Sequence, residues 1–141
     1  MSNGIRNRNY LSQFQNVSRT LILAAGDTPT TVGADFIVGR AGYTIYVLAI
    51  LVHVTTVAAQ AITFQDDNGT PKVLAVLPAS ATAGDVHRLI EDLLGEGVPC
   101  TEGKNLEFTG TAGVAGTIEV VAYLKPTGTR AAGNRAAGVG V

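Results

Sequence analysis

The stretch from Tyr43 to Val57 constrains this chain more than any other part of it. Eleven of its fifteen residues are Val, Ile, Thr or Tyr, types that favour pleated strands. The wider apolar segment 41–62 is long enough to cross a membrane as a helix, but no Lys or Arg follows it until Lys72 to anchor a far interface. We therefore predict one long strand, buried on both faces, and no membrane partner.

Short apolar runs alternate with turn-forming residues through the middle of the chain, at the spacing of about ten residues that is typical of sandwiches and barrels. The clearest hairpin has the turn Asp67-Asn68-Gly69, whose residues tolerate positive φ. No metal is expected at 66–68, because a turn explains these residues and the calcium-loop pattern is absent. We predict an all-β, antiparallel β-sandwich with strands at 19–25, 34–38, 43–56, 60–66, 72–77, 104–109 and 117–124.

Residues 85–97 are compatible with two structures. Asp85 is placed to cap the N-terminus of a helix. Apolar side chains then follow at helical spacing: Val86, Leu89, Ile90, Leu93 and Leu94. The segment is barely ten residues long before Gly95, which is close to the lower limit for a stable helix, and a surrounding sheet can override so short a pattern. The sequence leaves helix and strand open here.

Charge is distributed unevenly, although the net charge is only -1. The first twenty and the last seventeen residues carry six bases and no acid, whereas residues 21–124 carry four bases and all eleven acids. We expect an extended N-terminal arm at 1–18, a sandwich at 19–125 and a low-complexity, Gly/Ala-rich C-terminal tail at 126–141. Such ends cannot bury themselves, so a partner is expected to hold them.

Protein contact is the function that the basic ends favour. An arm with arginines and widely spaced apolar side chains can lie along a neighbouring subunit and fill separate pockets; an ordinary frayed terminus is the alternative. Nucleic acid is not expected as a partner, because each end has only three positive charges and no aromatic series for stacking. The residues expected to bind a partner are Arg6, Arg8, Tyr10, Leu11, Phe14, Arg130 and Arg135.

No group of residues indicates catalysis, a cofactor or a metal, so the chain is not expected to be an enzyme. His53 lies in the most apolar segment and is expected to be a satisfied core or interface histidine. Its replacement by alanine should cost more than that of His87 or Cys100. His87 lies among acids that indicate a solvated face. The single cysteine, Cys100, has no base nearby and is expected to be buried. The glycines at 110–116 lack the spacing of a phosphate-binding loop.

Several short motifs follow one another in the second half of the chain. After the hairpin come Gly95-Glu96-Gly97-Val98-Pro99-Cys100, then Gly103-Lys104-Asn105-Leu106, and a closing strand at 117–124. Over residues 60–124 this order resembles the small jelly-roll cement, or decoration, proteins of tailed-bacteriophage capsids. The resemblance implies an eight-stranded, jelly-roll-like sandwich, usually a homotrimer, bound to the major capsid protein on the outside of the virion, with terminal arms that brace neighbouring subunits.

Two functions are therefore expected. The first is a structural virion protein that cements capsid subunits, for which several weak contacts linked in one oligomer give high avidity. The alternative is a trimeric fibre or receptor-binding head module, which normally has a longer repetitive stalk. The apolar strand and the shortage of charge also favour a homotrimer, because one small sandwich cannot hide all these residues. The first eighteen residues lack the apolar run of a secretory signal, so synthesis in the host cytoplasm is expected.

A β-sandwich enzyme or a sugar-binding lectin is less well matched. The first would need clustered carboxylates, and the second would need exposed aromatic side chains for stacking. Only four Tyr and four Phe are present, and most of them lie in expected strands.

Overall fold

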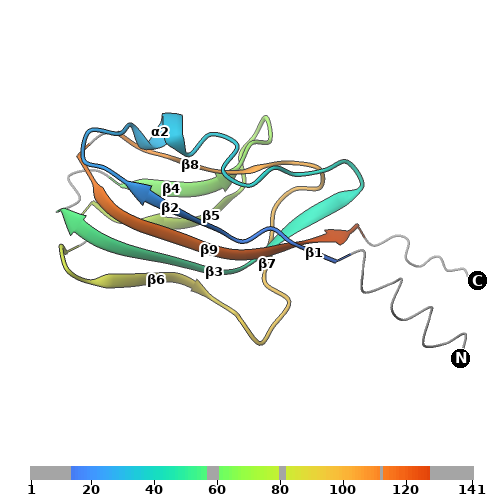
Figure 1. Ribbon diagram of the computed structural model, residues 1–141. Helices are drawn as coiled ribbons and strands as arrows, with labels where there is room; N and C mark the ends of the chain where they lie inside the picture. The colour runs from blue at the N-terminus through green and yellow to red at the C-terminus, as the bar shows by residue number, and fades with distance from the viewer. Residues whose placement is uncertain (1–13, 57–60, 80–81, 112, 128–141) are drawn as a thin grey trace, which may run out of the picture.

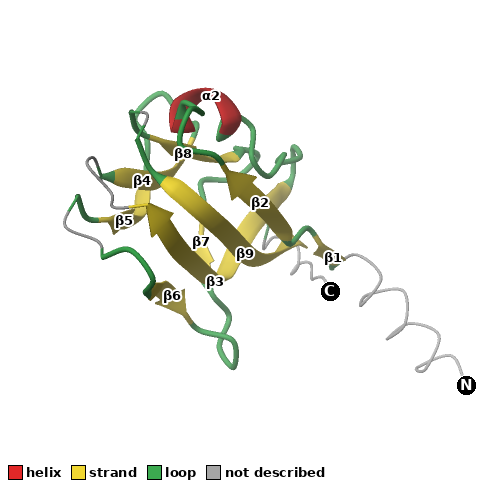
Figure 2. Ribbon diagram, turned by 60° about the vertical axis from the view of Figure 1, so that its left-hand side comes forward, coloured by secondary structure: helices red, strands yellow, loops and turns green. Residues whose placement is uncertain are grey.

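Two antiparallel β-sheets pack face to face in the computed structural model, which describes residues 14–56, 61–79, 82–111 and 113–127 (Figure 1). A single turn of helix, α2 (Pro29–Val32), lies beside the small sheet (Figure 2). The small sheet has the order β5 (Val73–Leu77), β4 (Ile62–Asp66), β8 (Leu106–Thr109). The large sheet contains β1 (Gln15–Asn16), β2 (Arg19–Leu23), β3 (Tyr43–Thr56), β6 (Val86–Glu91), β7 (Val98–Pro99) and β9 (Ala115–Pro126). The predicted all-β antiparallel sandwich is confirmed.

The order of the strands is jelly-roll-like. In the large sheet β9 and β3 lie side by side; β1 and β2 pair with the outer edge of β9, and β6 and β7 pair with the outer edge of β3. In the small sheet, Ile37 forms an isolated antiparallel bridge with Leu106 of β8. If this bridge is counted as a rudimentary strand, the small sheet has four strands. The longer strands of the large sheet, β2, β9, β3 and β6, form a facing layer of four, as in a jelly roll.

The long strand β3 begins and ends where the sequence predicts. Its register with β9 runs from Tyr43 opposite Pro126 to Thr56 opposite Ala115, with two bulges. Its inward side chains are buried, but most of its outward side chains are not, so the prediction of burial on both faces is wrong. The outward residues that remain half-buried or exposed include Tyr46, Leu48, Leu51 and His53. Among the described residues, no helix has the length and apolar character needed to span a membrane.

The core between the sheets is centred on three phenylalanines. The ring centroid of Phe108 lies 5.2 Å from that of Phe36 and 5.5 Å from that of Phe64, and all three side chains are buried. On the other layer, β9 and β3 approach closely at Gly116, where a Cβ would lie 2.1 Å from the carbonyl oxygen of His53. Only glycine fits at this position between the two paired central strands.

Two segments differ from expectation. The strand predicted at 34–38 is reduced to the bridge at Ile37, because Asp35 has a φ of 48° and this left-handed conformation interrupts an extended backbone. The segment 85–97, open between helix and strand, contains β6, because its backbone pairs with β3 from Ala49 to His53. An isolated helix of this length is only marginally stable in water, so pairing with β3 overrides the helical spacing.

The other predicted strands agree with the structure to within two residues at each end. The sequence did not predict β1, β7 or α2. Residues 15 and 16, which the sequence assigns to the arm, pair with β9, and Val17 packs against the core. The described part of the arm therefore already lies on the sandwich.

Candidate interaction site on the large sheet

An apolar groove of about 430 Å³ lies on the outer face of the large sheet, where β1 runs beside the end of β9. Phe14 comes from the segment that leads into β1, Leu48 from β3, and Val121 and Tyr123 from β9. These four side chains are half-buried. Strand alternation brings them together, because residues that point away from the core share one face of the sheet.

Three aromatic rings form a stack beside this groove. The centroids of Phe14 and Tyr123 are 5.9 Å apart, and those of Tyr123 and Tyr46 are 5.5 Å apart, with interplanar angles of 12° and 17°. The pairing of Tyr46 with Tyr123 across β3 and β9 sets the second contact. Cross-strand aromatic pairs contribute roughly 0.2–1 kcal/mol each. The stack therefore holds Phe14 against the sheet.

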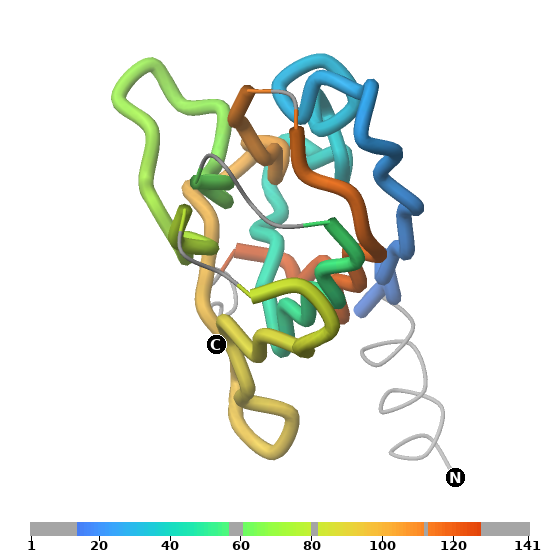
Figure 3. The backbone as a smooth tube through the Cα atoms, turned by 90° about the vertical axis from the view of Figure 1, so that its left-hand side faces the viewer, coloured from blue at the N-terminus to red at the C-terminus, as the bar shows by residue number. Residues whose placement is uncertain are grey.

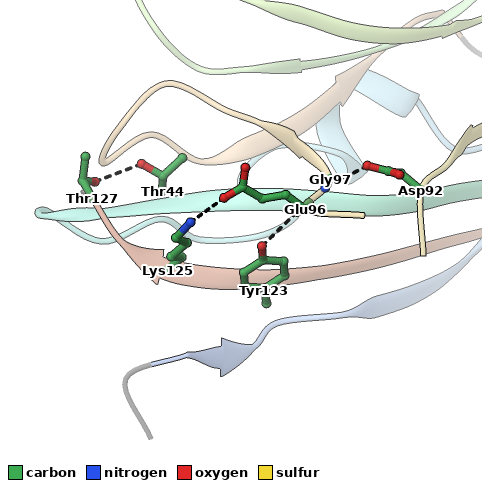
Figure 4. Close-up of polar contacts among 7 residues, drawn as sticks. All are labelled: Thr44, Asp92, Glu96, Gly97, Tyr123, Lys125 and Thr127. Carbon is green, nitrogen blue, oxygen red and sulfur yellow. Dashed lines mark hydrogen bonds and ion pairs between the residues drawn. The ribbon is translucent and has the colours of Figure 1, made fainter. Parts of the chain in front are cut away.

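The loop between β6 and β7 forms one border of the groove through Gly95. The carboxylate of Asp92 accepts a hydrogen bond of 2.9 Å from the amide of Gly97 (Figure 4). The Asp92 carbonyl accepts one of 3.1 Å from the amide of Gly95. Gly97 has a φ of 96°, a conformation that favours glycine. The loop is thus closed by its own side chain and backbone.

Strand β9 anchors the same loop (Figure 4). The hydroxyl of Tyr123 donates a 2.8 Å hydrogen bond to the carbonyl of Glu96, and the Lys125 ammonium pairs with the Glu96 carboxylate. Burial raises the pKa of Tyr123, and the hydrogen bond to Glu96 raises the pKa of Lys125. Both donors therefore carry their protons at neutral pH, so the anchor is complete under physiological conditions.

Both ends of the described chain lie at the same end of the large sheet. Gln15 pairs with Leu124, and the described chain stops three residues later at Thr127, whose hydroxyl lies 2.9 Å from that of Thr44 (Figures 1 and 4). The segments 1–13 and 128–141 carry four arginines and no acid. These basic segments join the sandwich beside the groove.

Of the residues predicted to bind a partner, Phe14 lies in the groove. The remaining predicted residues lie outside the part of the chain that the structure describes: Arg6, Arg8, Tyr10, Leu11, Arg130 and Arg135. Sequence reasoning missed Leu48, Val121 and Tyr123 as groove residues. The alternation in 117–124 gave a signal for the outward positions of β9, but it did not show which strands lie beside them.

A second cluster surrounds Asp66, a carboxylate that is completely buried. It accepts hydrogen bonds from the amides of Asn68 and Lys72 and from both the amide and the hydroxyl of Thr101. The predicted hairpin between β4 and β5 is confirmed. Among the described residues, no group of three or more His, Cys, Asp or Glu side chains is placed to hold a metal ion. Asp66 instead fixes the turn and ties it to the segment after β7.

Cys100 is buried, as predicted. Burial, assisted by the negative charge of Asp66, raises the pKa of its thiol to about 12. The thiolate is the nucleophilic form of cysteine, so this residue is protonated and inert at neutral pH.

The two histidines differ from the environments predicted for them. His53 is exposed on the outer face, so its placement in the core was wrong. His87 lies opposite Val52, which faces the core, and its Nε2 atom is buried without a hydrogen-bond partner. The acids around it are exposed, but the His87 side chain itself is half-buried and faces inward, so the prediction of a solvated face was wrong for this residue. Strand register decides both outcomes, because a shift of one residue moves a side chain to the other face.

Replacing His87 with leucine is expected to raise the free energy of unfolding by about 1 kcal/mol, because it removes a buried nitrogen that has no partner. The matched substitution His53→Leu, on the exposed face, should change stability by less than about 0.5 kcal/mol. Urea unfolding of both variants and the wild type measures these differences. A His87→Leu variant that is less stable than the wild type would contradict the inward placement of this side chain.

No protein-family model matches this chain, and neither a curated protein nor a solved structure shows significant similarity to it.

Proposed function

We propose that this chain is a structural virion protein that binds the outside of a phage capsid and cements neighbouring capsid subunits. In this proposal its partners are the major capsid protein and further copies of itself in a homotrimer. The observation that carries the proposal is the position of the two basic ends. Both join the sandwich at one end of the large sheet, next to the groove at Phe14.

This arrangement suits a protein that holds other subunits together. A sandwich keeps the attachment points of the two arms at a fixed separation, and an oligomer multiplies the number of arms on one particle. Several weak contacts that are linked in this way give high avidity. The jelly-roll-like order also agrees with the fold that the resemblance to capsid cement proteins implies.

The test is co-sedimentation with expanded capsids that lack this protein. Deleting residues 2–13 should lower capsid occupancy at least about tenfold, because it removes two arginines and the apolar anchors Tyr10 and Leu11. The melting temperature should stay nearly unchanged, because a segment rich in Asn, Gln, Ser and Arg with few apolar residues adds little to the central core. Added salt should weaken binding only modestly, since exposed ion pairs contribute about 0–1 kcal/mol.

Phe14→Ala provides the second arm of the test, and host cell envelopes provide the comparison surface. Equal capsid occupancy by the wild type, the deletion and Phe14→Ala would show that the N-terminal segment does not bind the capsid. Binding to envelopes without binding to capsids would instead identify a fibre or receptor-binding head module and overturn the proposed function.

A further inference from the structure

Two leucines are displayed to solvent at the tip of the β6–β7 loop. Leu93 is 58% exposed and Leu94 is 105% exposed. The sequence grouped both with the apolar face of a possible helix, but β6 ends at Glu91 and leaves them outside the core. Figure 3 shows this loop projecting from the body of the sandwich. Exposed leucines at the tip of a projecting loop have the character of an interaction site.

The loop holds its shape before any partner arrives. Asp92 closes it through Gly95 and Gly97, and its backbone amide donates a 2.7 Å hydrogen bond to the carbonyl of Leu48. Glu96 is fixed to β9 by Tyr123 and Lys125. A side chain presented by a preformed loop loses little conformational entropy on binding, which favours affinity.

The groove that accepts apolar side chains lies next to this loop on the same molecule. Gly95 borders the groove, whose walls are Phe14, Leu48, Val121 and Tyr123. Leu94 does not fill the groove of its own chain, since its side chain is fully exposed. Because one chain carries both an exposed leucine pair and an apolar groove, the leucines of each copy can bind the groove of the next copy. Such a head-to-tail contact closes into a ring when the rotation that relates neighbouring copies divides a full turn.

Charge complementarity also favours a second copy as the occupant. The loop and its start carry the carboxylates of Glu91, Asp92 and Glu96. The Glu91 and Glu96 side chains pair with Arg88 and Lys125 but remain more than half exposed. The thirteen residues that lead to Phe14 at the groove carry two arginines and no acid. The acidic loop of one copy and the basic sequence that precedes Phe14 in another copy therefore carry opposite charges.

We propose that Leu93 and Leu94 of one copy dock into the groove at Phe14 and Val121 of a neighbouring copy. This contact specifies how the copies of the proposed homotrimer bind one another. It rests on the proposed function for the trimer, but it does not require the capsid. Central, fully desolvated anchors dominate protein interfaces. Leu94 should be such an anchor, with Leu93 beside it.

Light scattering of the free protein gives the first test. The wild type should be a trimer at micromolar concentration, and Leu94→Ser and Val121→Arg should each weaken self-association at least about 30-fold. Circular dichroism melting of both variants checks that they fold. Leu94→Ser lies on an exposed loop and should melt like the wild type. A monomeric wild type, or a Leu94→Ser variant that associates as strongly as the wild type, would overturn the proposal.

Oxidative cross-linking gives a second test that does not rely on disruption. The double variant Leu94→Cys/Val121→Cys should form covalent trimers, whereas each single variant should not cross-link. Leu94→Cys/Thr63→Cys, with its second thiol on the small sheet, is the matched control and should stay uncrosslinked. The native Cys100 is buried and will not compete. Absence of cross-links in the first double variant, or cross-links in Leu94→Cys alone, would overturn the proposed contact.

These experiments separate the contact from the proposed function because they are done without capsids. Covalent trimers that fail to co-sediment with capsids would support this interface while removing the capsid role. A Leu94→Ser variant that keeps its trimer mass but no longer binds capsids would place the loop on the capsid protein instead and overturn the contact between copies.

Discussion

An Asp66→Ala variant is expected to lose about 4 kcal/mol of its free energy of unfolding. The carboxylate is completely buried and accepts hydrogen bonds from the amides of Asn68 and Lys72 and from the amide and hydroxyl of Thr101. Alanine supplies no acceptor, so four partly buried donors lose their acceptor at once. Thr101→Ser keeps the hydroxyl and should stay within about 1 kcal/mol of the wild type. Urea unfolding at pH 7 measures both differences.

The same carboxylate should make stability depend on pH in the acid range. Burial alone would raise the pKa of Asp66, but hydrogen bonds from Lys72, Thr101 and Asn68 outweigh it and hold the pKa below the usual value of 3.8. The folded state therefore binds this proton less readily than the unfolded chain. The contribution of Asp66 is complete above about pH 4 and is lost as the pH falls through the lower folded pKa. Asp66→Ala should show a flatter acid limb, and a limb as steep as that of the wild type would contradict this assignment.

A Phe108→Ala variant is expected to be destabilised by about 4 kcal/mol. Phe108 is buried and its ring contacts those of Phe36 and Phe64, so truncation removes apolar burial, two aromatic contacts and the filling of the space between the sheets. Aromatic pairs contribute about 0.5–1.5 kcal/mol beyond the area that they bury. Denaturant unfolding followed by circular dichroism gives the value.

Two substitutions calibrate the Phe108 result. Phe108→Leu retains much of the volume and should cost only about 1–2 kcal/mol. Val76→Ala on the outer side of β5, where the side chain is 46% exposed, should cost less than about 0.5 kcal/mol. If Phe108→Ala cost no more than Val76→Ala, the aromatic cluster would not be the centre of the core.

Local sequence patterns determined most of the strands. The β-branched run at 43–56 is one strand over its whole length, and the turn residues at 67–69 lie in the hairpin between β4 and β5. These features depend on backbone preferences within a few residues, and such local preferences do not require contacts with distant parts of the chain. The burial of Cys100 follows from its own chemistry and its apolar surroundings in the same way.

Pairing between distant segments decided the rest. Residues 86–91 have a helical pattern but form a strand, because the edge of β3 offers backbone partners. Register then directs His87 toward the core and His53 away from it, a choice that no local pattern contains. Two of the four hydrogen bonds that the Asp66 carboxylate accepts come from Thr101, which is thirty-five residues away in sequence.

The candidate site shows the same division. The apolar and basic character of the N-terminal segment was visible in the sequence, and it predicted Phe14 as a contact residue. The groove itself exists only because β1, β3 and β9 bring Phe14, Leu48 and Val121 together on one face. The exposure of Leu94 likewise depends on where β6 ends. Composition and alternation set which side chains can bind, whereas sheet order and register set which of them meet, because those depend on contacts between residues far apart in the chain.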